Sequence, residues 1–113
     1  MLALKDNAMW TKGRLGNGYE KLCLCKFLFF DMYFLRFPLD SYIDTHTDPV
    51  PKGRHFRLNI VLKKSKLGGV FVCDDAMINT PRIKYFRPDI QPHGVSPIRS
   101  GNRFVLSIGW IWP

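Results

Sequence analysis

The sequence predicts an all-β or mainly β domain, a double-stranded β-helix (jelly roll) with little added helix. Short runs rich in Val, Ile, Phe, Tyr and Leu recur along the 113 residues, and Pro, Gly, Asp and Asn separate them. Helical periodicity is almost absent. Hydrophobic residues make up 46% of the chain and aromatic residues 14%, which is enough for one core and argues against disorder.

Eight strands are expected in chain order, and they define the turns between them. The strands lie near residues 21–30, 32–37, 41–46, 56–63, 69–74, 82–87, 90–94 and 102–111. Asp31 is expected at a tight reversal between the first two strands, and Lys64–Gly69 at another turn. We treat 1–113 as a single domain, in which 1–20 is a lead-in with a short helix or loop over 1–18, and 21–113 is the jelly-roll core.

The composition predicts a soluble cytoplasmic protein with no membrane span. The most hydrophobic run is "LCLCKFLFFDMYFLRF", and charged residues interrupt it three times. The opening "MLALKDNAMW" lacks the long apolar segment of a secretory signal. The three cysteines, Cys23, Cys25 and Cys73, are expected to be reduced and mostly buried thiols.

The positive charge is concentrated in the second half of the chain. Residues 1–51 carry six Lys/Arg and six Asp/Glu, whereas residues 52–103 carry eleven Lys/Arg and three Asp/Glu, which gives the whole net charge of +8. A basic half favours an anionic ligand or polymer. The alternative is a solvated surface, which we prefer for "KKSK" (63–66) because it lies in a predicted turn.

A histidine and an aspartate two positions apart, in "SYIDTHTDPV" (41–50), are the first part of a predicted metal site. From extended backbone, His46 and Asp48 point the same way. Another histidine would complete a two-histidine, one-carboxylate triad, which suits non-haem Fe(II). His55 is close in sequence and lies in a charged connection. His93 is the better candidate, because a jelly roll returns a late strand beside the third one.

An arginine opens the last predicted strand, where Arg103, Val105 and Ser107 share one face. If that face lines the barrel, the arginine is buried, and a buried guanidinium requires a carboxylate or a similar partner. No acidic residue of the sequence is an obvious candidate. A ligand carboxylate is therefore the expected partner of Arg103.

Together, His46-Thr47-Asp48, His93 and Arg103 resemble the HxD…H…R signature of the Fe(II)/2-oxoglutarate-dependent dioxygenases, in particular their prolyl-hydroxylase-like branch. "LRFPLDSYIDTHTD" resembles the strand that leads to the metal pair in that superfamily. "LGGVFVC" is similar to its Gly-Gly strand start, and "YFRPDIQPHGVSPIRSGNRFVLSIGW" to its closing segment. The resemblance covers roughly residues 33–111. HxD alone is a weak signal, but the third histidine, the spacing of the arginine and the flanking segments make it specific.

The resemblance implies an enzyme and assigns roles to its residues. His46, Asp48 and His93 would bind Fe(II). Arg103 would bind the distal carboxylate of 2-oxoglutarate, assisted by Ser107. The implied reaction hydroxylates a protein, peptide or amino-acid side chain, consumes O2 and 2-oxoglutarate, releases succinate and CO2, and has ascorbate as a supporting reductant.

Three further residues are candidates for the cosubstrate pocket. Arg57 and Asn59 alternate with apolar residues in "FRLNIVL". They look into the barrel if the leucine and isoleucine pack outward, and the reverse orientation, with both polar side chains in water, is equally open. Tyr42 lies four residues before His46 on the same strand face and is a weaker candidate.

The chain departs from the family pattern in its length. Family members usually carry helices beside the barrel and long loops over the iron, for which 113 residues leave little room. The site is therefore either open to a large substrate or covered by a second subunit, as in a homodimer. The aromatic run "FLFFDMYF" (27–34) is a candidate surface for such a partner, although core burial of most of it is favoured. Asp40 stands where the related segments often have glycine.

Two rival classes remain beside the hydroxylase. One is a non-catalytic jelly-roll module that binds a metal or a small acid. The other acts on or binds nucleic acid, as an oxygenase or as a small basic domain. The spacing of Arg103 favours a peptide or amino-acid substrate, whereas the basic second half favours nucleic acid.

Overall fold

The computed structural model describes residues 10–13 and 18–113, and within them the only regular secondary structure is the β-strand. The strands are β1 (Trp10–Lys12), β2 (Glu20–Phe27), β3 (Phe30–Phe37), β4 (Ile43–His46), β5 (Arg54–Lys63), β6 (Leu67–Gly68), β7 (Phe71–Val72), β8 (Ile78–Asn79), β9 (Ile83–Phe86), β10 (His93–Val95), β11 (Ile98–Ser100) and β12 (Arg103–Trp112). The predicted all-β jelly-roll class is confirmed.

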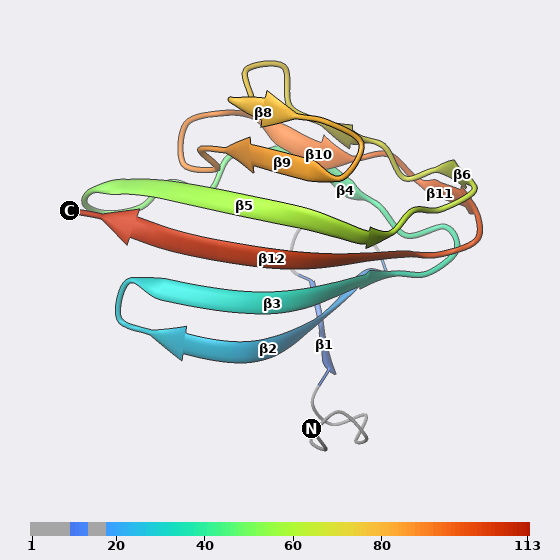
Figure 1. Cartoon of the computed structure of the whole chain (residues 1–113), viewed down its shortest axis with the longest axis horizontal. Coiled ribbons are helices and arrows are strands. Elements are labelled where there is room, and N and C mark those ends of the chain that lie inside the picture. Colours follow the sequence, from blue (N-terminus) through green and yellow to red (C-terminus); the bar gives the residue numbers. More distant parts are fainter. Residues whose placement is uncertain (1–9, 14–17) are drawn as a thin grey trace.

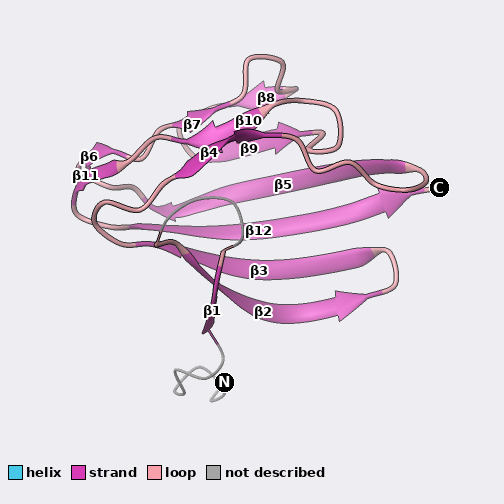
Figure 2. Cartoon of the chain, turned by 180° about the vertical axis from the view of Figure 1, so that it is seen from behind, coloured by secondary structure: helices cyan, strands magenta, loops and turns pink. Residues whose placement is uncertain are grey.

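The strands form two layers. A seven-stranded sheet has the order β1-β2-β3-β12-β5-β9-β8, a three-stranded sheet the order β4-β10-β7, and a two-stranded sheet joins β11 to β6. The three-stranded sheet lies against one face of the seven-stranded sheet (Figures 1 and 2). We call this covered face the inner face and the opposite one the outer face. The central strand β12 runs antiparallel to both of its neighbours, β3 and β5.

The core lies between the two layers. Its buried residues come from both of them and are Phe37, Val61, Phe71, Cys73, Phe86, Val95, Ile98 and Val105. The rings of Phe71, on β7, and Phe86, on β9, lie 4.9 Å apart and join the small sheet to the large one. The inner face is therefore buried where these apolar residues stand.

The first hairpin differs from its predicted form. The predicted reversal at Asp31 is wrong, because the turn falls at residues 28–29 and Asp31 lies inside β3, opposite Lys26. Asp31 takes part in a partly buried ion pair, in which Arg57 holds its carboxylate on the inner face. The tip of the hairpin is instead apolar, with Leu28 85% exposed.

The N-terminal prediction is wrong where it can be compared. Trp10–Lys12 form the strand β1, not a helix or loop, and residues 1–9 and 14–17 lie outside the described residues. The predicted turn at Lys64–Gly69 is confirmed only in part, because β5 ends at Lys63 but the segment contains the short strand β6. The short strands β6, β8 and β11 were not predicted individually, because two or three residues carry no readable alternation.

The three cysteines are free thiols, but most of them are not buried. Cys73 is buried in the core, Cys25 is partly covered and Cys23 is exposed. The prediction of mostly buried cysteines is therefore wrong for the pair on β2. Burial raises the pKa of the Cys73 thiol. In the described part of the chain, no helix is long and apolar enough to cross a membrane.

Asp40 has left-handed backbone with a φ of 70°. It lies in the turn that leads from β3 towards β4, where the Ser41 N–H donates to the Pro38 carbonyl at 3.1 Å. Glycine takes this conformation most easily, and aspartate is among the residues that tolerate it.

Candidate metal centre

The predicted metal ligands meet because β4 and β10 are paired. The two strands are antiparallel, and His93 is the direct partner of His46 in their register. Asp48 follows β4, and its N–H donates to the Pro88 carbonyl at 2.7 Å, which ties the chain after the strand to the segment before His93. Two strands distant in sequence thus bring three predicted ligands together.

Glycine next to His93 allows this close approach. A Cβ atom at Gly94 would stand 2.7 Å from the carbonyl oxygen of Ile43 and 3.0 Å from the backbone nitrogen of Thr45. Both atoms belong to the β4 backbone, which has no freedom to move aside. Only glycine lets β10 lie this close to β4.

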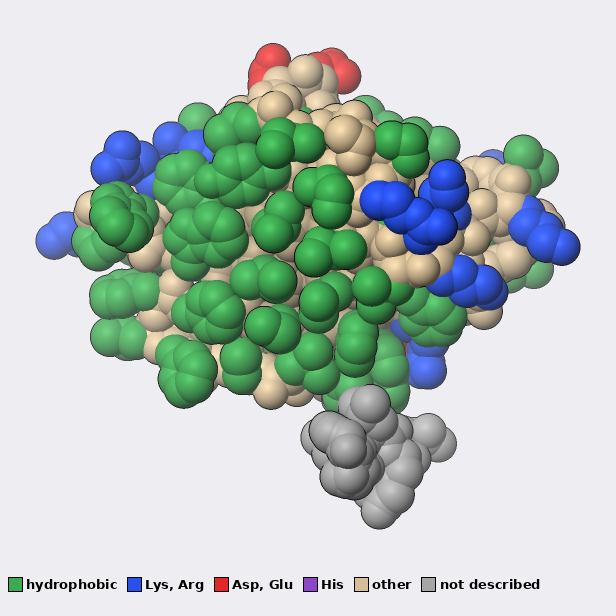
Figure 3. Space-filling model, in the orientation of Figure 1, with side chains coloured by type: hydrophobic (Ala, Val, Ile, Leu, Met, Phe, Trp, Pro, Cys, Tyr) green, Lys and Arg blue, Asp and Glu red, His purple; other side chains and the backbone are tan. Residues whose placement is uncertain are grey.

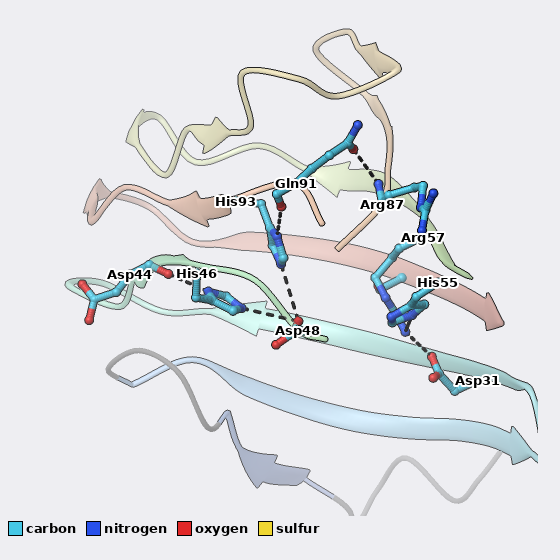
Figure 4. A network of polar contacts seen from close by, with 10 residues as sticks. Asp31, Asp44, His46, Asp48, His55, Arg57, Arg87, Gln91 and His93 are labelled. Carbon is cyan, nitrogen blue, oxygen red and sulfur yellow. Dashed lines mark hydrogen bonds and ion pairs between the residues drawn. The ribbon is translucent and has the colours of Figure 1, made fainter. Parts of the chain in front are cut away.

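The three ligand atoms converge on one point (Figure 4). The Nε2 atoms of His46 and His93 lie 3.5 and 3.6 Å from the Oδ2 atom of Asp48. The ligand atoms all lie within 4.8 Å of one another, and His93 is buried. Among the described residues, this group of His and Asp side chains has its ligand atoms close enough together to hold a metal ion.

Backbone carbonyls orient both imidazole rings. The Nδ1–H of His46 donates to the Asp44 carbonyl at 2.7 Å, and that of His93 donates to the Gln91 carbonyl at 2.9 Å (Figure 4). A carbonyl oxygen only accepts, so each Nδ1 atom carries a proton, and in the neutral ring the lone pair is on Nε2, which faces the other ligands. Such outer contacts fix ligand histidines in metal sites.

This donor set fits a metal ion. Two imidazole lone pairs and a carboxylate face one another, and a cation among them removes their mutual repulsion. A two-histidine, one-carboxylate set with open positions is the arrangement of non-haem Fe(II) centres. The residues present therefore fit the metal that the sequence predicts.

The third histidine, His55, stays outside this group. Its Nε2 atom lies 3.3 Å from Nη2 of Arg57, and its Nδ1 atom is buried without a hydrogen-bond partner. Burial, and then the charge of Arg57, lowers the pKa of His55 below the ordinary 6.5. The preference for His93 over His55 as the third member agrees with this placement.

Arg103 is buried beside the same cavity without a carboxylate. A cavity of about 360 Å³ on the inner face is lined by the metal group and by Arg103, which is 4% exposed. Its guanidinium lies 5.1 Å from the centre of the Phe37 ring, and no ion pair to it occurs within the described residues. Burial lowers the pKa of Arg103 to about 10.

Arg57 lines the cavity too, but protein groups satisfy it. Its Nη2 donates to Oδ1 of Asp31 and its Nη1 to Oγ of Ser107, both at 2.7 Å. Gly109, on β12, lies directly between Asp31 on β3 and Arg57 on β5. A Cβ atom at Gly109 would stand 2.0 Å from Nη2 of Arg57. The glycine thus leaves room for the arginine to cross β12 and reach Asp31.

The other predicted pocket residues have different positions. Asn59 is 8% exposed, lines the cavity and has a buried Oδ1 atom without a partner. Ser107 lines it as well, although its hydroxyl contacts Arg57 and not Arg103 as expected. Tyr42 is half-buried and is not among the residues that line the cavity.

Sequence reasoning missed several residues of the cavity wall. Asp31, Tyr33, Lys21 and Tyr19 line it from β2, β3 and the segment before them. Period-two alternation carried a signal for Asp31 and Tyr33, because they share a strand face with the core residue Phe37. The misplaced turn at Asp31 hid that alternation.

No protein-family model and no curated protein sequence matches the chain. Solved structures do match it. A prolyl-4-hydroxylase from Pseudomonas putida is 21% identical with a TM-score of 0.57, over 73% of this chain and 50% of that one. A viral collagen prolyl hydroxylase from Paramecium bursaria Chlorella virus-1, in complex with 2OG, is 20% identical with a TM-score of 0.58, over 79% and 61%.

A third similar structure is an RmlC-like cupin protein from Desulfovibrio desulfuricans. It is 19% identical with a TM-score of 0.55, over 93% of this chain and 85% of that one. At these identities the likeness shows the fold alone, and the chain spans half the length of the Pseudomonas putida protein. The chain has a cupin-like jelly-roll fold, and its His-Asp-His group is suited to hold a metal ion.

Proposed function

We propose that this chain is an Fe(II)- and 2-oxoglutarate-dependent dioxygenase that hydroxylates a protein, peptide or amino-acid side chain. The observation that carries the proposal is the difference between the two arginines of the cavity. Asp31 neutralises Arg57, whereas Arg103 has no carboxylate among the described residues. A buried guanidinium without a counter-charge is costly, and a ligand carboxylate in the cavity relieves that cost.

A second buried cation strengthens the case for an anionic ligand. Lys84 is 8% exposed, and its Nζ donates to Oδ1 of Asn79 at 2.8 Å, a neutral partner. Burial, and then the charge of Arg103, lowers the pKa of Lys84. Lys84 lines a second cavity, which Arg103 also lines, so a dicarboxylate bound to Arg103 would add negative charge beside a region that holds two buried cations.

The residues of this chain have separate roles in the proposed reaction. His46, Asp48 and His93 would hold Fe(II), and Arg103 would bind the distal carboxylate of 2-oxoglutarate. When bound, Fe(II) and 2-oxoglutarate reduce O2, so that one oxygen atom enters the substrate as a hydroxyl group and the other enters succinate, with loss of CO2. Phe37 excludes water around Arg103, which strengthens its attraction for a carboxylate.

Two neighbouring groups would orient the ligands. The unpartnered Oδ1 atom of Asn59 would accept a hydrogen bond from a bound molecule, because it lies on the cavity wall. The Asp31–Arg57 pair stands near His55 and leaves Arg57 with no unneutralised charge (Figure 4). Arg57 would therefore bind a neutral acceptor such as a peptide carbonyl in preference to a phosphate, which supports a peptide substrate.

The test is release of succinate from 2-oxoglutarate by purified protein supplied with Fe(II) and ascorbate. We expect slow release without a substrate and faster release with the right peptide or amino acid. Arg103→Met should weaken 2-oxoglutarate binding at least about 100-fold while Fe(II) still binds, because a buried charged contact is lost. Arg99→Met, which changes an exposed arginine, is the matched control and should keep wild-type rates.

Two results would reject the proposal in favour of its rivals. Tight metal binding with no succinate release would identify a non-catalytic binding module, which the likeness to a cupin also accommodates. Salt-dependent binding of nucleic acid that survives His46→Ala, without succinate release, would identify a nucleic-acid-binding domain. Equal affinity of Arg103→Met and wild type for 2-oxoglutarate would show that Arg103 has another role.

A further inference from the structure

The outer face of the seven-stranded sheet is apolar across five strands (Figure 3). Strand register places its side chains in three rows that cross the sheet. One row is Phe34–Leu106–Ile60–Ile83, the next is Met32–Ile108–Leu58–Tyr85–Ile78, and the last is Phe30–Trp110–Phe56. We call these twelve residues the outer apolar face. No charged residue interrupts them.

These side chains are only partly covered. From Arg103 to Trp110 in β12, buried inner residues alternate with half-exposed outer residues. The half-exposed residues are all apolar. The surface continues at its margin through Phe27, which is 69% exposed and pairs with Phe30, and through Trp112, which is 61% exposed. Apolar patches larger than a few hundred Å² are rare on monomeric proteins and mark interaction surfaces.

The size of the outer apolar face can be compared with that of a dimer interface. Strands lie about 4.8 Å apart and side chains on one face about 6.8 Å apart, so the twelve residues project to an area of roughly 400 Å². The accessible surface of protruding side chains exceeds this projection. Stable protein interfaces remove about 600 to 1,000 Å² from each partner, and the protruding side chains, with Phe27 and Trp112 at the margin, bring this face towards the lower end of that range.

We propose that a second copy of this chain covers the outer apolar face, sheet against sheet. Two antiparallel sheets pack face to face as in a β-sandwich, with their strands about 30° apart. A symmetric dimer brings the same patch against itself, and this patch opposes no like charges because it contains none. The stacked rings of Phe56, Tyr85 and Trp110, 6.1 to 6.2 Å apart, would form its rigid centre.

The margin of the patch is basic. The row beside Leu106 is Arg36–Phe104–Lys63, and the guanidinium of Arg87 lies 5.5 Å from the centre of the Phe56 ring. Each copy carries a net charge of +8, so two copies repel each other at long range. Salt screens that repulsion and leaves the apolar contact intact. Dimerisation should therefore tighten as salt rises, which is opposite to the response of a charge-driven complex.

Such a dimer leaves both metal centres accessible. The metal group and Arg103 line a cavity on the inner face, whereas the outer apolar face is the other side of the same sheet. The proposal is thus independent of the proposed activity. An inactive protein that dimerises would support it, and an active protein that stays monomeric would reject it.

Sedimentation equilibrium of the purified full chain tests the proposal. We expect a mass of twice the 13.2 kDa of the chain at micromolar concentration, with a dissociation constant that falls as salt rises. Ile108→Lys and Leu58→Lys, in the middle row, should each weaken dimerisation on the order of 100-fold, because the interface would bury an unpaired charge. Leu39→Lys, which changes a loop residue that is 58% exposed, should leave the dimer unchanged.

Circular dichroism shows whether the two lysine variants still fold, so that a loss of dimer can be separated from a loss of structure. Both middle-row variants should keep the β-sheet spectrum, since the altered side chains are half-exposed in the single chain. A monomer at every concentration and salt level would overturn the proposal. Dimers that survive in both folded variants would overturn it as well, and so would a wild-type chain that is monomeric alone and pairs only with a different protein.

Discussion

The two faces of the central strand β12 both differ from those of an ordinary sheet that has one face in water. Arg103 and Ser107 point into the buried inner face, while Leu106, Ile108 and Trp110 point outward and are half-exposed. A sheet with one solvated face normally alternates apolar inside and polar outside. Val105 on the inner face belongs to the core, but the buried Arg103 and the half-exposed apolar residues break this rule, which is why we propose a charged ligand on the inner face and an apolar partner on the outer one.

The largest expected effect removes a metal ligand from the inner face. His93→Ala should weaken binding of Co(II), a spectroscopic probe for the site, at least about 100-fold, because the buried Nε2 donor is lost. The absorption of bound Co(II) measures this. His55→Ala is the control, since His55 lines the cavity outside the metal group. Unchanged binding in His93→Ala would contradict the assignment of the metal centre.

Neighbouring truncations compare the two faces directly. Val105→Ala, in the core, should lower the free energy of unfolding by about 2–3 kcal/mol at every protein concentration, because it leaves a cavity. Ile108→Ala, on the outer apolar face, should cost under about 1 kcal/mol in dilute protein and more as concentration rises and dimers form. Urea titrations at two concentrations distinguish them. A concentration-independent cost at Ile108 would show that no second copy covers it.

Replacing the unpaired arginine should stabilise the fold. Burial lowers the pKa of Arg103 to about 10, so the side chain stays charged at neutral pH and folding bears the cost of removing that charge from water. Arg103→Met should raise the free energy of unfolding of the ligand-free protein by about 1–3 kcal/mol. Calorimetry without ligand measures this. A less stable variant would mean that the protein itself compensates the charge.

The smallest expected effect is a pH dependence at His55. Its folded pKa lies below the ordinary 6.5, despite opposing effects of Asp31, Asp48 and Asp89, so the unfolded chain binds its proton first as pH falls. Stability from this group is therefore complete above 6.5 and declines below it. His55→Gln should make the acid side of the stability profile shallower. An unchanged slope in thermal unfolding between pH 7 and 5 would show that burial of His55 is immaterial.

The fold class and the metal group could be predicted from the sequence, because both depend on the alternation of side chains along strands and on the order in which the strands pair. Alternation fixes which side chains share a strand face, and the return of a late jelly-roll strand brings His93 beside His46. Long-range contacts between side chains were less accessible. The Asp31–Arg57 pair joins strands on either side of β12 and needs Gly109 between them, which no local pattern reveals.

The aromatic run at residues 27–34 shows a different limit. Most of it was expected in the core, yet Phe27, Leu28 and Phe29 are exposed, and Phe30, Met32 and Phe34 lie on the outer apolar face. An apolar residue signals a surface that avoids water, but not whether the covering surface belongs to the same chain. Core burial is therefore wrong for these residues, and a partner surface stays a prediction.

Anaerobic absorption spectroscopy tests the central claim most directly. Fe(II) chelated by a keto acid absorbs visible light by charge transfer, so titration of 2-oxoglutarate into the Fe(II)-loaded chain reports both ligands at once. We expect a band that saturates at one 2-oxoglutarate per chain, that is lost in His93→Ala, and that requires at least about 100-fold more 2-oxoglutarate in Arg103→Met. An Fe(II)-loaded protein that develops no band, or one whose band is indifferent to Arg103, would contradict the account.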